Sequence, residues 1–236
     1  MIGILISLCS KKQDWKEVGD VDFIKQFLDS FIFTISNKYD NIDILKKRVP
    51  KASIVVLPKS CNGNPCEAWN VLLKKAYEDG CEYFYQVGSD ITHQVKCWDE
   101  YFIKIMKSND NDCIVGGVDM MYWCERAIRD QAPILENVFF GRKHYERFGW
   151  LFPPEVKSWF SDDLLTKIYR NVDKLFICPN IKFQNCNRVG GHNDKSRYVP
   201  PENTPIAKNW FLHANTYTTK GFPEVDQSYL KAPIYN

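Results

Sequence analysis

The stretch that decides the fold is CEYFYQVGSD, residues 81–90. Residues 81–87 are mostly aromatic and apolar, which is typical of a central strand of a sheet. Gly88, Ser89 and Asp90 follow where this strand would end. In open α/β sheets, ligands bind beyond the carboxyl ends of the strands. Asp90 is therefore a candidate ligand-binding residue, although an aspartate after a strand is also a common turn or capping residue.

A helix is predicted immediately before this strand. Asn64 can cap it, Pro65 suits the first helical position, and Glu67 occupies the place of a capping-box carboxylate. Gly80 would end the helix. The apolar stripe that it would bury consists of Ala68, Val71, Leu72 and Ala76.

Outside this unit, predicted strands and helices alternate along the chain. Strands are expected at 2–8, 52–57, 113–118, 138–140 and 175–178. Helices are expected at 23–35, 98–106, 142–148 and 153–169. Beyond Pro179 the chain is polar and is interpreted as loops or an extended tail. The alternation predicts an α/β fold with a mostly parallel central sheet flanked by helices.

Composition narrows the class of protein. A chain of 236 residues is long enough for one large core. Its 31 basic and 29 acidic residues nearly cancel without forming a basic patch, so no nucleic-acid partner is expected. Nine cysteines cannot all pair, and their scatter suits reduced thiols in a cytoplasmic protein. The apolar N-terminus has no basic residue before it, which favours a strand over a signal peptide, and no membrane span is expected.

The order of these motifs resembles the donor half of GT-A glycosyltransferases. In that family a glycine loop, a helix with Ala-x-Asn and a strand ending in Asp-x-Asp follow one another, as do Gly63, Ala68-Trp69-Asn70 and Gly88-Ser89-Asp90 here. The resemblance implies a GT-A-like (Rossmann-like) fold in which Asp90 binds Mn²⁺ or Mg²⁺. That ion would bridge the two phosphates of a UDP- or GDP-sugar donor and stabilise the charge of the leaving diphosphate. Gly88 replaces the first aspartate of the family's motif.

A wider resemblance, over residues 1–170, is to glycosyltransferase-like proteins of large DNA viruses and protists. The motifs that carry it are CNGNPC at 61–66, GSDI at 88–91, RKH at 142–144, FGWLFPPE at 148–155 and WFSDD at 159–163. In those proteins the strand end usually has two adjacent aspartates, and Ser89 replaces the first. For a viral protein this resemblance implies the host cytoplasm.

The resemblance also implies a division of the chain. We expect a single GT-A-like domain over 1–236, with a donor-binding half at about 1–118 and an acceptor and catalytic half at about 119–200. Residues 201–236 would form a C-terminal extension. Asn62, Trp69, Asn70 and Ser89 are expected to line the donor pocket, together with Ser10 after the first strand.

An acidic pair, Asp162 and Asp163, lies in the second half of the chain. In inverting GT-A enzymes such a pair on a late helix supplies the general base, which takes the proton from the acceptor hydroxyl. Asp163 matches the second acid of the family's pair and is the expected base, with Asp162 bracing either Asp163 or the adjacent loop. The alternative is a solvated pair at a helix start, where negative charge is favoured.

His192, in the glycine-containing loop VGGHND at 189–194, is a candidate further metal ligand. The alternative is an ordinary surface histidine. The aspartate-rich second strand of related proteins, whose aspartate recognises the nucleobase, has no evident counterpart here. Either Asp40 or Asp43 replaces that aspartate, or base recognition is altered or lost.

Three functional hypotheses remain open. The first is a metal-dependent inverting glycosyltransferase acting on a glycan or protein acceptor. The second is a degenerate relative that binds a nucleotide or sugar without turnover, which Gly88, Ser89 and the apparently missing strand favour. The third is a nucleotidyltransferase, which would need a glycine-rich basic loop after the first strand. Residues 8–13 contain no glycine, which counts against it.

Overall fold

The computed structural model describes residues 2–9, 31–36, 52–61, 63–88, 91–120, 134–185 and 209–224. Within them lies one eight-stranded sheet with the strand order β3-β2-β1-β4-β7-β6-β8-β5. The strands are β1 Ile2–Cys9, β2 Phe31–Ser36, β3 Ala52–Val56, β4 Tyr83–Val87, β5 Ile91–His93, β6 Ile114–Asp119, β7 Val138–Gly141 and β8 Leu175–Asn185. The α-helices are α3 Pro65–Glu78, α4 Trp98–Ser108, α6 Arg142–Phe148, α7 Ser161–Arg170 and α9 Trp210–Gly221, and a short 3-10 helix, η2, spans Lys59–Cys61.

Six of the eight strands point the same way. β1, β2, β3 and β4 pair in parallel, and β8 is parallel to β6. β7 is antiparallel to both β4 and β6, and β5 is antiparallel to β8. The ends of β1, β2, β3, β4 and β6 therefore lie at one edge of the sheet, called the carboxyl edge below. The opposite edge, where these strands begin, is called the amino edge.

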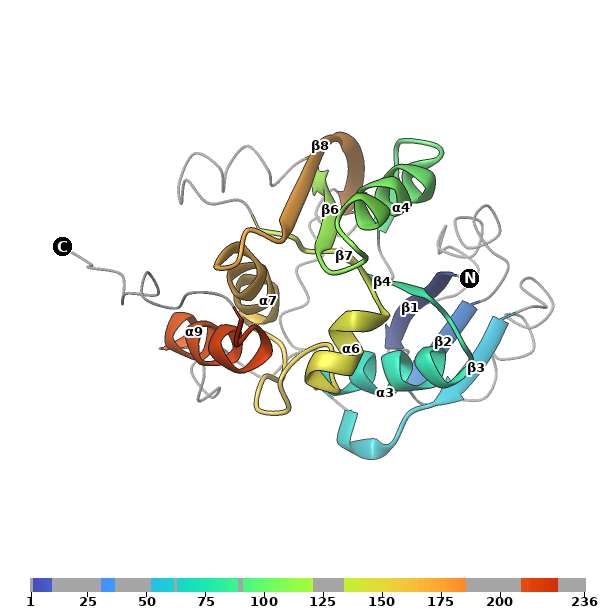
Figure 1. The fold of residues 1–236 in the computed structure, drawn as a ribbon. Coiled ribbons are helices and arrows are strands. Elements are labelled where there is room, and N and C mark those ends of the chain that lie inside the picture. The colour runs from blue at the N-terminus through green and yellow to red at the C-terminus, as the bar shows by residue number, and fades with distance from the viewer. Residues whose placement is uncertain are drawn as a thin grey trace.

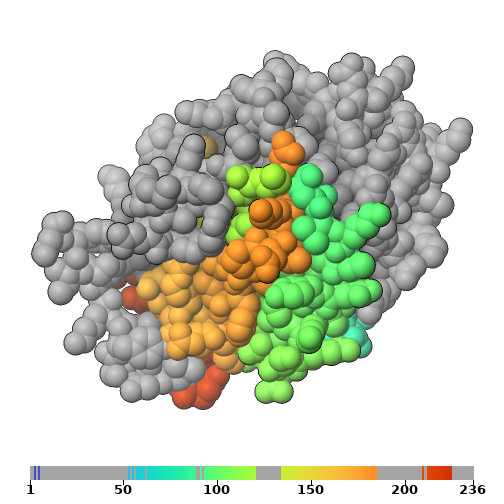
Figure 2. Space-filling model, turned by 90° about the horizontal axis from the view of Figure 1, so that it is seen from above, coloured from blue at the N-terminus to red at the C-terminus, as the bar shows by residue number. Residues whose placement is uncertain are grey.

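Helices cover both faces of the sheet (Figure 1). α4 lies above it in that view, and α3, α6, α7 and α9 lie below it. Successive side chains of β4 point to opposite faces of the sheet. Phe84 packs on Phe140 on the lower face, and Tyr85 packs on Trp98 on the upper face. Figure 2 shows the upper face, with α4 in green beside β8 in orange.

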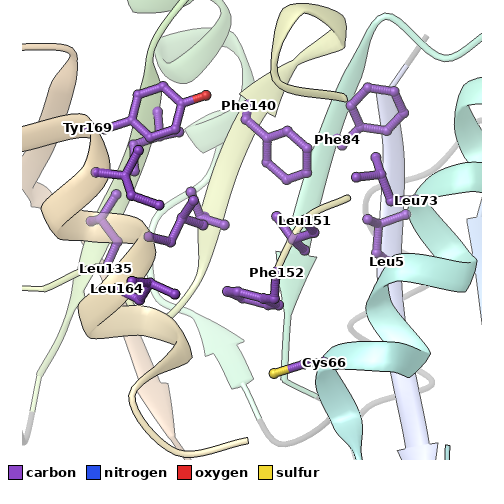
Figure 3. Packing of buried hydrophobic residues seen from close by; sticks show 14 of the residues in the cluster. Leu5, Cys66, Leu73, Phe84, Leu135, Phe140, Leu151, Phe152, Leu164 and Tyr169 are labelled. Carbon is purple, nitrogen blue, oxygen red and sulfur yellow. The ribbon is translucent and has the colours of Figure 1, made fainter. Parts of the chain in front are cut away.

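A core of buried hydrophobic residues lies between the sheet and the lower helices (Figure 3). Phe84 and Phe140 from the sheet meet Leu73 of α3 and Leu164 and Tyr169 of α7 there. Burying aliphatic and aromatic side chains contributes about 1.5–3 kcal/mol each. This packing holds α3 and α7 in fixed positions on the sheet.

The predicted start and end of α3 are confirmed. The Asn64 Oδ1 atom accepts from the Glu67 backbone N–H at 3.2 Å, and Asn64 Nδ2 donates to Glu67 Oε2 at 3.0 Å. Gly80 adopts a φ of +83° just after the helix, a conformation that glycine adopts without strain. Local sequence signals were sufficient for this element.

The predicted helix at 23–35 is wrong over residues 31–35, which belong to β2, Phe31–Ser36. Phe31, Ile32 and Ile35 satisfy helical spacing, but the run FIFTIS is also rich in aromatic and β-branched residues. β2 lies between β1 and β3, where an apolar run fits on both faces of a strand. A strand is therefore present where none was expected, although it contains no aspartate. Residues 23–30, Asp40 and Asp43 lie outside the described residues.

Three further expectations needed correction. The helix predicted at 153–169 begins only at Ser161, and Pro153 and Pro154 lie before it in turns. β8 continues past Pro179, because the β6–β8 pairing jumps from Ile177 to Lys182 and leaves the proline in an irregularity without ladder bonds. Part of the predicted C-terminal tail forms α9. None of the described helices is long and apolar enough to cross a membrane.

Candidate active site at the carboxyl edge

The connections of the sheet bring two predicted segments to the same edge. α3 leads into β4, and α7 leads into β8. A helix that connects into a parallel strand runs back across the sheet, so its N-terminus lies near the carboxyl ends of the strands. The N-terminus of α3, in the predicted donor half, and that of α7, with the acidic pair, therefore both lie at the carboxyl edge.

Direct contacts join these two helix starts. The Cys66 backbone N–H donates to the Lys157 carbonyl at 3.3 Å, and the thiol lies 4.0 Å from the Ser158 carbonyl. Burial raises the pKa of the Cys66 thiol above its ordinary value, a nearby Asp162 charge raises it further, and a hydrogen bond with Ser161 opposes both effects. Cys66 is therefore a neutral, buried contact between α3 and the start of α7.

Asn70 holds the segment that leads to the acidic pair. Its Oδ1 atom accepts from the backbone N–H groups of Leu151 and Phe152 at 2.8 and 2.9 Å, and its Nδ2 atom donates to the Phe152 carbonyl at 2.7 Å. Together these three hydrogen bonds use both the oxygen and the nitrogen of the Asn70 side-chain amide. The described contacts of Asn70 link α3 to residues 151–152, and its expected place in the donor pocket stays a prediction.

Trp69, the neighbour of Asn70 in α3, also contacts Phe152. Its ring packs on Phe152 with centroids 5.7 Å apart, and it is partly buried against the core. The indole N–H is buried and has no hydrogen-bond partner among the described residues. Its expected role in the donor pocket stays a prediction.

The acidic pair occupies the first turn of α7 and is partly exposed. Asp162 Oδ1 accepts from the Asp163 backbone N–H at 3.0 Å, so Asp162 is engaged with the helix start. The Asp163 charge raises the pKa of Arg170, although burial lowers that pKa more strongly. Phe160, just before the helix, has a φ of +66°, a rare conformation for an aromatic residue. Such strain is concentrated at functional sites.

The end of β4 is fixed by a residue that the sequence did not suggest. The Gly88 backbone N–H donates to Asn137 Oδ1 at 3.1 Å, and Asn137 is 2% exposed. Its Nδ2 atom is buried without a hydrogen-bond partner among the described residues. A buried polar group left unpaired costs about 1–3 kcal/mol. Two residues earlier, the Leu135 N–H donates to Thr166 Oγ1 of α7 at 3.0 Å, so this segment also connects β4 to the acidic helix.

Asp119 is a second residue that the sequence alone did not suggest. It ends β6 at the carboxyl edge and is 4% exposed. The signal that could have found it is the one that identified Asp90, a carboxylate directly after an apolar strand. Its burial at this edge makes it a further candidate site residue.

Five predicted site residues lie outside the described residues: Ser10, Asn62, Ser89, Asp90 and His192. Gly88 and Ile91 flank two of them, so the chain enters and leaves the Ser89-Asp90 pair at described positions. Within the described residues, no group of three His, Cys, Asp or Glu side chains could hold a metal ion. The metal site at Asp90 and His192 therefore stays a prediction.

No protein-family model matches the sequence, and no curated protein matches it. Among solved structures, the fold is similar to that of S. aureus TarS, with a TM-score of 0.62 and 14% identity over 97% of this chain. The chain spans 41% of the length of that TarS structure, and 68% of the structure of TarS 1–349, which it matches with a TM-score of 0.61 and 14% identity.

The fold is also similar to that of glucosyl-3-phosphoglycerate synthase from Mycobacterium tuberculosis in complex with Mn²⁺, UDP-glucose and phosphoglyceric acid. The TM-score is 0.56 with 10% identity, over 92% of this chain and 79% of that chain. The α/β fold with an open mixed sheet is thus of the GT-A class, as predicted. The resemblance to viral and protist proteins stays a prediction.

Proposed function

We propose that the protein is a GT-A glycosyltransferase that moves a sugar from a nucleotide-diphosphate sugar to an acceptor hydroxyl, with inversion. The observation that supports this most directly is the meeting of two segments at the carboxyl edge. The end of β4, which leads into Ser89 and Asp90, and the acidic start of α7 are joined there through Asn137, Leu135 and Thr166.

Asp90 is the proposed metal ligand and His192 a further one, and both lie outside the described residues. A divalent cation there would supply positive charge to the diphosphate as it departs. The synthase from Mycobacterium tuberculosis was crystallised with Mn²⁺ and UDP-glucose, which supports a UDP-sugar as the first donor to test. Ser10, Asn62 and Ser89 are proposed to contact the donor.

Asp163 is the proposed general base. Its carboxylate would take the proton of the acceptor hydroxyl while that oxygen attacks the anomeric carbon from the side opposite the diphosphate. The bond from the anomeric carbon to the diphosphate oxygen breaks, and the diphosphate leaves with the electron pair. Asp162 Oδ1 accepts from the Asp163 backbone N–H, which fits the bracing role proposed for Asp162. The acceptor is proposed to be a glycan or a protein hydroxyl.

A binding protein without turnover is the second candidate, favoured by Gly88 and Ser89 at the strand end. The other reason for it is weakened, because β2 lies between β1 and β3, but β2 contains no aspartate and Asp40 and Asp43 lie outside the described residues. A donor panel separates the two candidates.

The test measures release of nucleotide diphosphate from UDP- and GDP-sugars, with Mn²⁺, with Mg²⁺ and with EDTA. We expect metal-dependent turnover of at least one donor in the wild type and its loss in Asp90→Ala. Turnover that persists in Asp90→Ala would contradict the role of that residue. Metal-dependent donor binding without turnover, with every donor and with added glycan and protein acceptors, would favour the binding protein instead.

A further inference from the structure

One buried asparagine at the carboxyl edge uses only half of its amide. Asn137 precedes β7, and its Oδ1 atom accepts from the Gly88 N–H at 3.1 Å. Because a backbone N–H can only donate, this bond identifies the oxygen end of the amide. The other end, Nδ2, is a buried hydrogen-bond donor with no partner among the described residues.

Two other asparagines show what such an amide normally does. Asn70 Nδ2 donates to the Phe152 carbonyl at 2.7 Å. Asn171 Nδ2 donates to Asn215 Oδ1 at 2.9 Å and to Thr218 Oγ1 at 3.1 Å. Buried polar side-chain atoms in native proteins are paired in the large majority of cases. An unpaired N–H group beside the proposed nucleotide-sugar site therefore indicates a hydrogen-bond acceptor that arrives with a ligand.

The position of Asn137 is restricted from two sides. A Cβ atom on Gly116 of β6 would lie 2.7 Å from the Asn137 carbonyl oxygen and 2.7 Å from Leu135 Cδ2, so the backbone there packs directly on β6. The Leu135 N–H is held by Thr166 of α7 at 3.0 Å. Asn137 is thus fixed relative to both the end of β4 and the acidic helix.

We propose that Asn137 is a donor-binding residue whose Nδ2 group donates a hydrogen bond to a diphosphate oxygen of the bound nucleotide-sugar. Its Oδ1 atom at the same time fixes the peptide that leads into Ser89 and Asp90. The diphosphate is the matching partner because its oxygens are anionic acceptors, and hydrogen bonds to ionised acceptors are the stronger ones. This inference rests on the proposed function, which places the diphosphate at the end of β4.

The test is calorimetric titration with UDP in the presence of Mn²⁺. Asn137→Asp keeps an oxygen for the Gly88 N–H, but it replaces the donor with a carboxylate oxygen that repels an anion. Asn137→Ser removes the amide donor without adding charge. We expect the Kd for UDP to rise at least tenfold in both variants, and more in Asn137→Asp. With the turned-over donor, the KM should rise more than kcat falls.

Asn171→Ser is the matched control, because it alters a buried asparagine that lies outside the proposed site. It should leave the Kd for UDP within twofold of the wild type. An Asn137→Asp protein that folds, as judged by its melting temperature, and binds UDP within twofold of the wild type would overturn the contact. If Asn137→Asp does not fold, Asn137→Ser decides the question by the same criterion.

Failure of this inference differs from failure of the proposed function. If Asp90→Ala loses UDP binding and the Asn137 variants retain it, only the role of Asn137 is wrong. If the wild type binds neither UDP nor GDP with Mn²⁺, both proposals are wrong.

Discussion

The polar side chains at the two edges of the sheet differ in how they are paired. At the amino edge Asp112 accepts from Arg147 at 2.5 Å and also pairs with Lys174. Both cations lie over the Phe222 ring, with Arg147 Cζ 4.0 Å and Lys174 Nζ 5.3 Å from its centroid. This cluster joins the turn before β6 to α6, to the start of β8 and to the end of α9. Its charges pair with one another, so removing the carboxylate would leave two cations without their partner.

The carboxyl edge instead has two buried side-chain N–H groups without partners among the described residues, and the amino edge has one such ring nitrogen, His144 Nε2 in the first turn of α6. Asn70 holds residues 151–152 by three hydrogen bonds, whereas Asn137 Nδ2 and Trp69 Nε1 are buried without partners among the described residues. Proteins tend to break local rules of pairing at functional sites. The comparison therefore assigns stability mainly to the amino edge and chemistry to the carboxyl edge, and the variants below test that division.

The largest expected effect is on turnover and comes from the carboxyl edge. Asp163→Asn should lower the transfer rate by about 10²–10⁴-fold, because an amide cannot accept the acceptor's proton. Its melting temperature should stay close to that of the wild type. Asp162→Asn is the matched variant and should lower the rate less. Steady-state rates at saturating donor check this, and an equal loss in both variants would contradict the assignment of Asp163 as base.

The next effect is on stability and comes from the amino edge. Asp112→Ala leaves Arg147 and Lys174 without their carboxylate, which we expect to cost about 2–3 kcal/mol, less than for a fully buried pair because both cations are partly exposed. Urea unfolding at pH 7 measures it. Donor affinity should not change, and a tenfold loss of it would contradict the division between the edges.

The same carboxylate predicts a pH dependence. Burial raises the pKa of Asp112, but hydrogen bonds from Arg147 and Lys174 outweigh it, so the pKa lies below its ordinary value of 3.8. A carboxylate with a depressed pKa contributes stability that is present above the ordinary value and is lost as the pH falls below it. The difference in unfolding free energy between the wild type and Asp112→Asn should therefore shrink as the pH is lowered from about 5 to 3. A difference that stays constant over this range would contradict the ion-pair account.

A smaller effect is expected from the Asn70 clamp. Asn70→Ala leaves the backbone groups of Leu151 and Phe152 without their partners, which should cost about 1–3 kcal/mol of stability. Transfer should also slow, because residues 151–152 lead to the acidic pair. Lys74→Ala on the exposed side of α3 is the control and should change stability by less than about 0.5 kcal/mol. Wild-type turnover in Asn70→Ala would show that the clamp does not position the pair.

The smallest effect is expected from Gly116→Ala. The added methyl group would meet the Asn137 carbonyl and the Leu135 side chain at 2.7 Å, so the segment before β7 must move. Overpacking of this kind costs about 1–3 kcal/mol, and we expect the low end because the segment is short. Donor affinity should fall as Asn137 shifts. Unchanged stability and affinity would mean that this segment adapts freely.

The accuracy of the sequence predictions depended on how local the signal was. α3 was predicted well because Asn64, Pro65 and Glu67 act within its first turn and Gly80 acts directly after its end. β2 was mistaken for a helix because a short apolar run fits both periods, and only its insertion between β1 and β3 distinguishes them. The continuation of β8 past Pro179 depended on an irregular pairing with β6 that no local pattern shows.

The residues of the candidate site also differ in whether the sequence alone could suggest them. The motif order drew attention to the end of β4 and to Asp162 and Asp163, because the residue types themselves suggest chemistry. Asn137 could not be found, since its importance comes from a contact with Gly88, which lies 49 positions away in the chain. Asn70 was selected by its motif, but its partners at Leu151 and Phe152 became visible only in three dimensions.

The most direct test of the division between the edges is titration of UDP-glucose with Mn²⁺ into the wild type, Asp90→Ala and Asp112→Asn under identical conditions. The account predicts that Asp112→Asn binds the donor as tightly as the wild type, despite its lower stability, and that Asp90→Ala binds it at least tenfold more weakly. Equal affinity for all three proteins, or a loss confined to Asp112→Asn, would contradict a donor site at the carboxyl edge.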